Sequence, residues 1–499
     1  MSGAERLGIT ADVLVIGFGK GGKDLAGTMG REGRRVVMVE QSDQMYGGTC
    51  VNIGCVPTKA LVHHADVRRP GDDPQSWYHD AIGAVTDLTT MTRGRNFEML
   101  DTLDTVTVVT GRASFLDATT VEVAAGDDRL TVSAATIVIN TGSVPVVPDI
   151  RGLRDSAYLA TSTDLLHTEE LPRHLAVIGG GYLGLEFAAM YRQFGSEVSV
   201  LEAFPAFMGR EDDDVADVVV GILRDQGITL IPDAKVTEVR DGSVDTTVCY
   251  EAGGRPRTLR ADKILVATGR APAIEGLGLD RAGIRTTERG AIEVDEHLRT
   301  SRPHIYAIGD VNGGPQFTYI SQDDHRIVAD LLLGDGTRST ADRRAVPHTM
   351  FITPPLSTVG LTETAARERG HNVRTAGKLV ARATATHRPR IMGDTRGLIK
   401  LVIDADTDLV LGAALISIDS QEVINLVALA MRHDVPAREL GNSIYTHPST
   451  TEVLNELLGT VARVGAQVPA GGRPGIARSP STYWARPKPN DQSSGPFSV

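Results

Sequence analysis

Two cysteines, Cys50 and Cys55, lie five positions apart in the stretch GGTCVNIGCVPTK. In a regular helix this spacing is about 7.5 Å along the axis, whereas a disulfide needs Cα atoms closer than about 7 Å. A disulfide would therefore require a distorted turn, which Asn52 and Gly54 tolerate. Pro57 suits the first turn of a helix that resumes beyond it. The pattern predicts a dithiol at a helix N-terminus, where the helix dipole favours a thiolate.

The cysteine pair alone leaves three interpretations open. Lys59 adds positive charge beside it and favours a redox-active dithiol. Two structural thiols are the simplest rival. A metal site made from Cys50, Cys55, His63 and His64 is the other.

Composition narrows the class of protein. The chain has 499 residues, 41% of them hydrophobic and 23% charged, which predicts several globular domains. A formal net charge of −12 argues against nucleic acid or a membrane surface as a partner. The polar start at residues 1–6 predicts no signal peptide, and no apolar run reaches membrane-spanning length. With three cysteines only, we expect a cytoplasmic protein without a disulfide framework.

The cysteines follow a nucleotide-binding pattern. Residues 11–16 are typical of a buried parallel strand and lead into G-x-G-x-x-G. A helix and a second strand come next, ending at Glu40, 18 positions after the last glycine. Gly17 makes the tight turn, Gly19 lets the backbone approach a pyrophosphate, and Gly22 allows close helix–strand packing. The helix N-terminus would bind the phosphates, and Glu40 would accept hydrogen bonds from ribose.

The same pattern recurs about 160 positions later. A strand leads into Gly179, Gly181 and Gly184, and the next strand ends at Glu202, again 18 positions after the last glycine. Two complete units are a far more specific signal than one. A carboxylate at the end of the second strand favours NADH, because NADPH would require a positive group for its 2′-phosphate.

The remaining strands predict how these units are connected. Residues 111–115 and 136–143 are expected to return to the first sheet, and residues 263–270 complete the second unit. A strand at 305–310 leads back to the first unit, so the second is inserted into it. From about residue 347 the pattern predicts a separate α+β domain.

One histidine of that last domain stands out. His447 and Pro448 are predicted to begin a helix, and Glu452 lies close enough to orient the imidazole. A surface or capping histidine is the simpler interpretation. Cys249, in a strand-like run, is expected to be a buried structural thiol.

Taken together, these motifs resemble the flavin-dependent pyridine nucleotide–disulfide oxidoreductases, which include lipoamide dehydrogenase, glutathione reductase and mercuric reductase. The resemblance covers about residues 10–462 and includes ATGR at 267–270. Within the family the chain is most similar to the reactive-chlorine-resistance branch, a relative of mercuric reductase described as an NADH-dependent copper(II) reductase. QFTYIS at 316–321 and MGDTRG at 392–397 carry this closer likeness.

The resemblance implies a role for each matching residue. Cys55 would be the charge-transfer thiolate at the flavin, and Cys50 the thiol that meets the substrate. Lys59 would lie near the flavin N5, paired with Glu186, for which a solvated helix face is the simpler interpretation. The implied catalytic residues are Cys50, Cys55, Lys59, Glu186, His447 and Glu452. Those implied to bind FAD are Gly17, Gly19, Gly22, Glu40, Gly48, Thr49, Lys59, Ala113, Thr141, Gly142, Asp310, Gln316, Phe317, Thr318 and Tyr319. Those implied to bind NADH are Gly179, Gly181, Tyr182, Leu183, Gly184, Glu202 and Gly269.

The fold class implied is α/β, with two Rossmann-like nucleotide-binding domains, the second inserted in the first, and a C-terminal α+β dimerisation domain. We expect an FAD-binding domain with the cysteine pair at 1–150, an NAD(P)H-binding domain at 151–272, and a return to the FAD domain at 273–345. The dimerisation domain would span 346–464, and 465–499 would be a disordered tail. His447 and Glu452 would reach across the two-fold axis of a homodimer into the partner's active site.

The function implied is electron transfer from NADH through FAD and the Cys50–Cys55 disulfide to an acceptor such as Cu(II) or Hg(II), in defence against oxidants or metals. No resident metal site is expected. Two alternatives remain: a dihydrolipoamide dehydrogenase or other small-molecule disulfide reductase, and a flavoprotein sensor in which Cys50–Cys55 switches a partner interface.

Overall fold

A computed structural model describes residues 7–459 of the chain. The predicted tail, and the last residues of the predicted dimerisation domain, lie outside this range. None of the helices within it is both long and apolar enough to cross a membrane.

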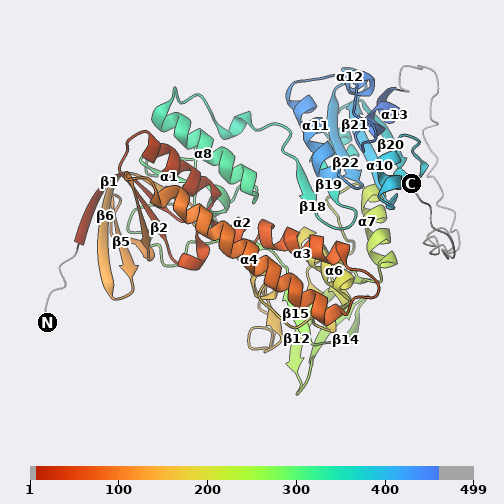
Figure 1. Cartoon of the computed structure of the whole chain (residues 1–499), viewed down its shortest axis with the longest axis horizontal. Coiled ribbons are helices and arrows are strands. Elements are labelled where there is room, and N and C mark those ends of the chain that lie inside the picture. The colour runs from red at the N-terminus through yellow and green to blue at the C-terminus, as the bar shows by residue number, and fades with distance from the viewer. Residues whose placement is uncertain (1–6, 460–499) are drawn as a thin grey trace, which may run out of the picture.

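The first fold is built on a sheet in the order β3-β2-β1-β6-β5-β4, with β17 beside β6. Parallel pairing joins β1, β2, β3, β6 and β17, whereas β4 and β5 add an antiparallel edge. The parallel strands are continuously apolar where they pair at the centre of the sheet, at residues 13–16, 36–39 and 137–139, because both faces are buried there, one of them under helices α1 and α8 (Figure 1). The elements are β1 (Leu7–Ile16), α1 (Lys20–Arg31), β2 (Val36–Glu40), β3 (Val106–Thr110), β4 (Arg112–Phe115), β5 (Thr120–Ala125), β6 (Asp128–Ile139), β17 (Ile305–Ala307) and α8 (Thr318–Leu333).

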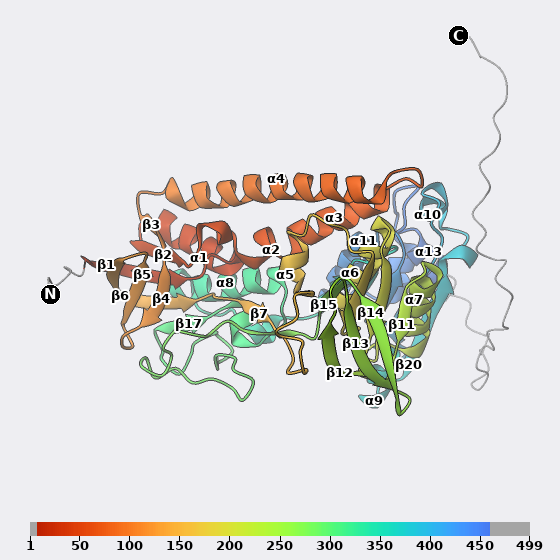
Figure 2. The same ribbon diagram turned by 90° about the horizontal axis from the view of Figure 1, so that it is seen from below.

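The cysteine stretch follows β2 and leads into a long helix. Its elements are η1 (Asp43–Met45), α2 (Gly48–Asn52), α3 (Cys55–Val67) and α4 (Pro74–Asp101). Figure 2 shows α4 running along one side of the molecule, from the first fold to the second. Asp73 caps the start of α4 by accepting from the backbone N–H of Ser76.

The second fold lies in sequence between β6 and β17, so it is inserted in the first, as predicted. Its sheet is parallel, in the order β11-β10-β9-β15-β8, and an antiparallel sheet of β12, β13 and β14 adjoins it. A ribbon of β7 and β16 joins the two folds. The elements are β7 (Ser143–Pro145), β8 (Leu159–Ala160), α5 (Ser162–Leu165), β9 (His174–Ile178), α6 (Tyr182–Phe194), β10 (Glu197–Leu201), α7 (Asp213–Asp225), β11 (Thr229–Ile231), β12 (Ala234–Asp241), β13 (Thr246–Ala252), β14 (Arg255–Ala261), β15 (Lys263–Val266) and β16 (Arg270–Pro272).

The C-terminal domain is an antiparallel sheet in the order β18-β19-β22-β21-β20, with α11 packed on β19 and β22 (Figure 1). Short 3₁₀ turns η2 (Gly309–Asn312) and η3 (Thr340–Asp342) precede it. Its elements are β18 (His348–Met350), β19 (Leu356–Gly360), α9 (Glu363–Glu368), β20 (Val373–Leu379), η4 (Val380–Arg382), α10 (His387–Ile391), β21 (Leu398–Asp404), β22 (Val410–Ile416), α11 (Ser420–Arg432), α12 (Ala437–Asn442) and α13 (Val453–Gly459).

The predicted helix start at Pro448 is wrong. Pro448 lies in a loop, and α13 begins at Val453. The first backbone hydrogen bonds here join Val453 N to Thr450 O and Leu454 N to Thr451 O, each spanning three residues. This tighter 3₁₀-type bonding delays the regular helix by a turn.

Candidate functional site

A cavity of about 1100 Å³ lies between the two folds and the C-terminal domain. Its volume exceeds the usual range for a small-molecule site, so it has room for a large cofactor. Most of the residues predicted from the sequence to bind FAD or to do chemistry line it. These are Gly17, Gly19, Glu40, Gly48, Thr49, Cys50, Cys55, Lys59, Ala113, Thr141, Gly142, Tyr182, Leu183, Glu186, Asp310, Gln316, Phe317, Thr318 and Tyr319.

The distorted turn between the cysteines is present. Helix α2 ends at Asn52 and α3 begins at Cys55, so the break falls on Ile53 and Gly54. A Cβ on Gly54 would lie 2.8 Å from the carbonyl oxygen of Thr49, which explains the glycine. Both cysteines are free thiols in the structure, and Cys55 is the first residue of α3, as expected for a thiol at a helix N-terminus.

The two thiols differ in their affinity for a proton. A hydrogen bond from Cys50 lowers the pKa of Cys55 to about 6; burial opposes this, while the Thr318 hydroxyl and the Lys59 charge reinforce it. The same hydrogen bond, together with burial, raises the pKa of Cys50. Cys55 is therefore the thiolate at neutral pH, and Cys50 keeps its proton.

An ion pair connects the dithiol helix to the second fold. Lys59 Nζ of α3 lies 2.7 Å from Glu186 Oε2 of α6. The other carboxylate oxygen of Glu186 accepts from Phe351 N at 2.7 Å, and the ammonium lies 4.8 Å from the centre of the Phe351 ring. Glu186 is only 5% exposed, which rules out the solvated helix face. The first fold, the second fold and the C-terminal domain meet at this point.

Each glycine motif is held by the acid that follows it. Glu40 accepts from Phe18 N at 2.9 Å in the first motif, and Glu202 accepts from Gly180 N at 2.7 Å in the second. The remaining oxygen of each acid accepts from a backbone N–H just beyond its strand. The last glycine of each motif packs tightly, as predicted. A Cβ on Gly22 or Gly184 would lie 2.6 or 2.0 Å from the carbonyl oxygen that opens its motif.

The residues around the first motif fit a bound dinucleotide. The Thr141 hydroxyl is buried and has no hydrogen-bond partner, so a ligand in the cavity can supply one. Gly142 has φ +73°, a conformation that favours glycine. Burial raises the pKa of Glu40, and ribose hydroxyls would stabilise its carboxylate.

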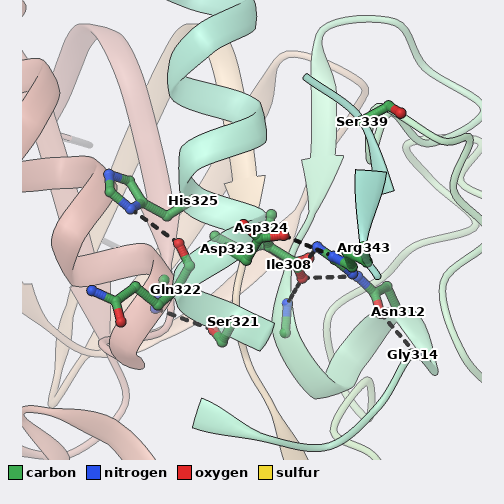
Figure 3. A network of polar contacts seen from close by, with 12 residues as sticks. Ile308, Asn312, Gly314, Ser321, Gln322, Asp323, Asp324, His325, Ser339 and Arg343 are labelled. Atoms are coloured by element: carbon green, nitrogen blue, oxygen red, sulfur yellow. Dashed lines mark hydrogen bonds and ion pairs between the residues drawn. The ribbon is translucent and has the colours of Figure 1, made fainter. Parts of the chain in front are cut away.

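Figure 3 shows a polar network around the buried Asp324 and its partner Arg343, and this network reaches the turn that carries Asp310. Asp324 is fully buried; its carboxylate accepts from Gly309 N at 2.6 Å and pairs with Arg343. Burial raises the pKa of Asp324, and the hydrogen bonds and the guanidinium oppose that rise. The network fixes the turn that carries Asp310, to which Ser143 donates at 2.7 Å. Asp324 and Arg343 were not predicted from the sequence. The only local signal for Asp324 is an acid within a partly apolar helix, and Arg343 has none.

A wall of stacked rings faces the dithiol side of the cavity. Tyr182 and Phe317 stack on His348, with ring centroids 5.6 and 5.9 Å away, and Tyr319 stacks on Phe317 at 5.1 Å. The Tyr182 hydroxyl donates to Glu211 at 2.5 Å. Burial lowers the pKa of His348. His348 was not predicted from the sequence, because no regular spacing relates it to the other rings.

Some predicted residues lie away from the cavity. His447 and Glu452 are not among its lining; they lie 2.8 Å apart on the C-terminal domain, where the His447 side chain is 63% exposed. Gly181 of the second motif and Gly269, which follows β15, have open space beside them, so a ligand can approach the backbone at both places. The other predicted NADH residues outside the cavity lining are Gly179, Gly184 and Glu202.

The remaining cysteine and histidines have other surroundings. Cys249 is buried in β13, and Arg240 donates to its sulfur at 2.8 Å, so the expected buried thiol is confirmed. Within residues 7–459, no three or more His, Cys, Asp or Glu side chains are arranged to hold a metal ion, so the rival site with His63 and His64 is not formed.

Comparison with known proteins gives consistent matches along the chain. A family model described as pyridine nucleotide-disulphide oxidoreductase matches residues 11–324, and one described as the dimerisation domain of such enzymes matches residues 346–458. The chain is 45% identical over 448 residues to a probable pyridine nucleotide-disulfide oxidoreductase, RclA, of Escherichia coli K12, covering 90% of this chain and 98% of that protein. It is 33% identical over 453 residues to a mercuric reductase of Staphylococcus aureus, covering 89% and 81%. The solved Cu(II) complex of the HOCl-induced flavoprotein disulfide reductase RclA from Escherichia coli superposes with a TM-score of 0.86 at 43% identity, covering 91% of this chain and all of that one.

Proposed function

Because the chain belongs to the pyridine nucleotide-disulphide oxidoreductase family, we propose that it uses NADH and FAD to reduce a metal ion, with Cu(II) or Hg(II) as the acceptor, through Cys50 and Cys55. The observation that carries the proposal is the placement of Cys50 and Cys55 on either side of the break between α2 and α3, in a cavity that Lys59 also lines. The lowered pKa of Cys55 and the raised pKa of Cys50 agree with a thiolate beside a protonated thiol. The copper complex and the mercuric reductase among the relatives favour a metal acceptor.

The residues of the first motif would hold FAD. The N-terminus of α1, which follows Gly19, would take the pyrophosphate. Glu40 would accept from ribose, and Thr141 and Asp310 would contact the rest of the cofactor within the cavity. When bound, FAD supplies a two-electron relay between the nicotinamide and the dithiol.

NADH would bind at the second motif. The open backbone at Gly181 leaves room for the pyrophosphate. Glu202 would accept from the ribose hydroxyls, and its charge disfavours a 2′-phosphate. Tyr182 and Leu183 line the same cavity as the cysteines, so the two ligands would meet there.

The chain's own residues then account for the reaction. Cys50 and Cys55 lose two electrons and one proton as they form a disulfide, because Cys55 is already a thiolate, and two Cu(II) ions become two Cu(I) ions. With the nicotinamide included, NADH + 2 Cu²⁺ gives NAD⁺ + 2 Cu⁺ + H⁺. Lys59 stabilises the Cys55 thiolate, and Glu186 fixes the position of the ammonium. Thiolates favour Cu(I), which makes reduction at this site favourable.

We further propose that the enzyme is a homodimer whose sites are shared. His447 is exposed and lies outside the cavity that holds the dithiol of its own chain. In the homodimer it would reach the other subunit's Cys50 and move its proton. Mixed dimers of Cys50→Ser and His447→Gln chains test this arrangement. One site of each mixed dimer is complete, so about half of the activity should return, and no recovery would contradict the sharing.

The acceptor is tested with FAD-loaded enzyme in a steady-state assay. We expect NADH oxidation to be stimulated by Cu(II) or Hg(II), more strongly with NADH than with NADPH, and abolished in Cys50→Ser. A panel of disulfides that includes lipoamide separates the disulfide-reductase alternative, which strong turnover with lipoamide would favour. Negligible multiple turnover with every acceptor would instead favour the redox sensor. Full metal reduction by Cys50→Ser would remove the dithiol from the route.

A further inference from the structure

A second histidine lies beside His447. The ring of His387, the first residue of α10, is 5.3 Å from the His447 ring, centroid to centroid, with the planes at 73°. Both side chains are exposed. Two imidazoles that bind one metal ion at about 2 Å each have ring centres about this far apart.

Two acids one helical turn apart hold the two histidines in place. Glu452 accepts from His447 and, at 2.9 Å, from Ser449 N. Glu456 of α13 accepts from Ala385 N at 2.6 Å, just before His387, and from Lys378 at 2.5 Å. Burial opposes ionisation of Glu456, but these hydrogen bonds lower its pKa to about 2.

The segment before His387 is also anchored in the domain core. Thr386 is fully buried, and its hydroxyl donates to the carbonyl oxygens of Val380 and Ala383 at 3.0 and 2.8 Å. Pro389, two residues beyond His387, is buried as well. The exposed imidazole therefore stands on a fixed backbone.

His447 keeps one ring nitrogen available for a metal ion. Glu452 occupies Nδ1 of His447, which leaves Nε2 of that ring for a ligand. A histidine that ligates a metal commonly donates its other N–H to a carboxylate, which orients the ring and raises its basicity. The neighbouring cation, Arg388, is paired with Asp419 at 3.1 Å, so its charge is partly neutralised.

We propose that His387 and His447 together form a docking site for Cu(II). The inference rests on the proposed function, because the docked ion would be the acceptor that the other subunit's dithiol reduces. Imidazole nitrogens bind Cu(II) more strongly than the other common divalent first-row ions, whereas thiolates favour Cu(I). The pair would hold the oxidised ion and leave the reduced ion to the sulfurs. Water or a sulfur across the dimer would complete the coordination.

The test uses holoenzyme with the Cys50–Cys55 disulfide formed and no NADH, so that no turnover occurs and thiols do not bind the metal. Cu(II) is titrated, and bound copper is followed by electron paramagnetic resonance. We expect nitrogen couplings from two imidazoles in the wild type and from one in His387→Phe, which keeps an aromatic ring against His447. The affinity for Cu(II) should fall at least about tenfold in His387→Phe, because removing even a residue that only orients a metal ligand costs about that much.

The control is His63→Phe. His63 and His64 are also adjacent, with ring centroids 5.9 Å apart, but no carboxylate is hydrogen-bonded to either ring among the described contacts. This variant should bind Cu(II) as the wild type does. Equal losses in both variants, or an unchanged spectrum in His387→Phe, would overturn the proposal.

Kinetics separate this inference from the proposed function. In His387→Phe the KM for Cu(II) should rise about tenfold while kcat and turnover with disulfides stay unchanged. A parallel loss of copper and disulfide turnover would mean that His387 acts only by supporting His447, and would refute its role as a ligand. If the wild type binds Cu(II) at this pair but never reduces it, the proposed function fails and the docking site stands.

Discussion

The proton distribution within the dithiol predicts what happens when Cys50 is replaced by alanine. With a pKa of about 6, Cys55 is thiolate over thiol by about ten to one at pH 7. The largest cause is the hydrogen bond from Cys50, which Cys50→Ala removes. A hydrogen bond to a charged group contributes about 1.5–3 kcal/mol, and about 1.4 kcal/mol corresponds to one pH unit. We therefore expect the pKa of Cys55 to rise to between about 7 and 8.

Alkylation of reduced holoenzyme by iodoacetamide measures this change. The rate at Cys55, read by mass spectrometry across pH 5 to 9, follows the thiolate fraction. Cys50→Ser is the matched control, because its hydroxyl can still donate, and its midpoint should lie between those of the wild type and the alanine variant. If the midpoint of Cys50→Ala stays near 6, the hydrogen bond is not the main cause, and Lys59 and Thr318 must hold the thiolate instead.

Three further predictions concern charged groups. Lys59→Met leaves Glu186 buried without its cation, so the free energy of unfolding measured in urea should fall by about 1–3 kcal/mol. This is less than for a fully buried pair, because Lys59 is partly exposed. The double variant Lys59→Met/Glu186→Gln should recover most of the lost stability. The buried Lys400 contacts several carboxylates, among them Asp212, whose pKa is lowered by hydrogen bonds and by Lys400 although burial opposes this. The stability from Asp212 is therefore present at neutral pH and lost as the pH falls through its folded-state pKa. Thermal melts between pH 7 and 3 should show that Lys400→Met loses this stability at a higher pH than the wild type. Melting temperatures that fall over the same pH range in both proteins would contradict this. Glu452→Gln should lower kcat about tenfold with a disulfide acceptor, because the imidazole loses its orientation, while FAD content stays unchanged; an equal fall in FAD content would indicate misfolding instead.

The sequence predicted the parts of the site that depend on local spacing. The glycine motifs, their acids and the break between the cysteines lie within short segments. In such segments the positions of glycine and proline indicate the backbone conformation directly. The fold class and the family predicted from these motifs are confirmed. The contact between Lys59 and Glu186, 127 positions apart, was available only through the resemblance, and the structure shows it as an ion pair. The exact domain boundaries and the residue roles stay predictions.

Other parts depend on tertiary packing that leaves no local pattern. His348 reaches the cavity from the C-terminal domain, and Phe351 binds Glu186 through its backbone, so side-chain type carries no signal for that contact. Arg343 lies in a polar, charged segment that carries no apolar pattern, yet it pairs with the buried Asp324. The helix at Pro448 was misplaced because residue preferences do not reveal the 3₁₀-type hydrogen bonds that delay it.

The hydrogen bonds made by Glu202 have a consequence for any attempt to change the nucleotide that the enzyme uses. Its two oxygens accept hydrogen bonds from Gly180 N and Phe204 N, so this carboxylate stabilises the loop in addition to the ribose contact proposed for it. Replacing it with a neutral or basic residue to admit a 2′-phosphate would release both N–H groups at once. Redesign of the coenzyme preference therefore needs a second substitution that restores a hydrogen-bond acceptor for these two N–H groups. A change at Glu202 alone would alter both the coenzyme preference and the stability of the loop conformation.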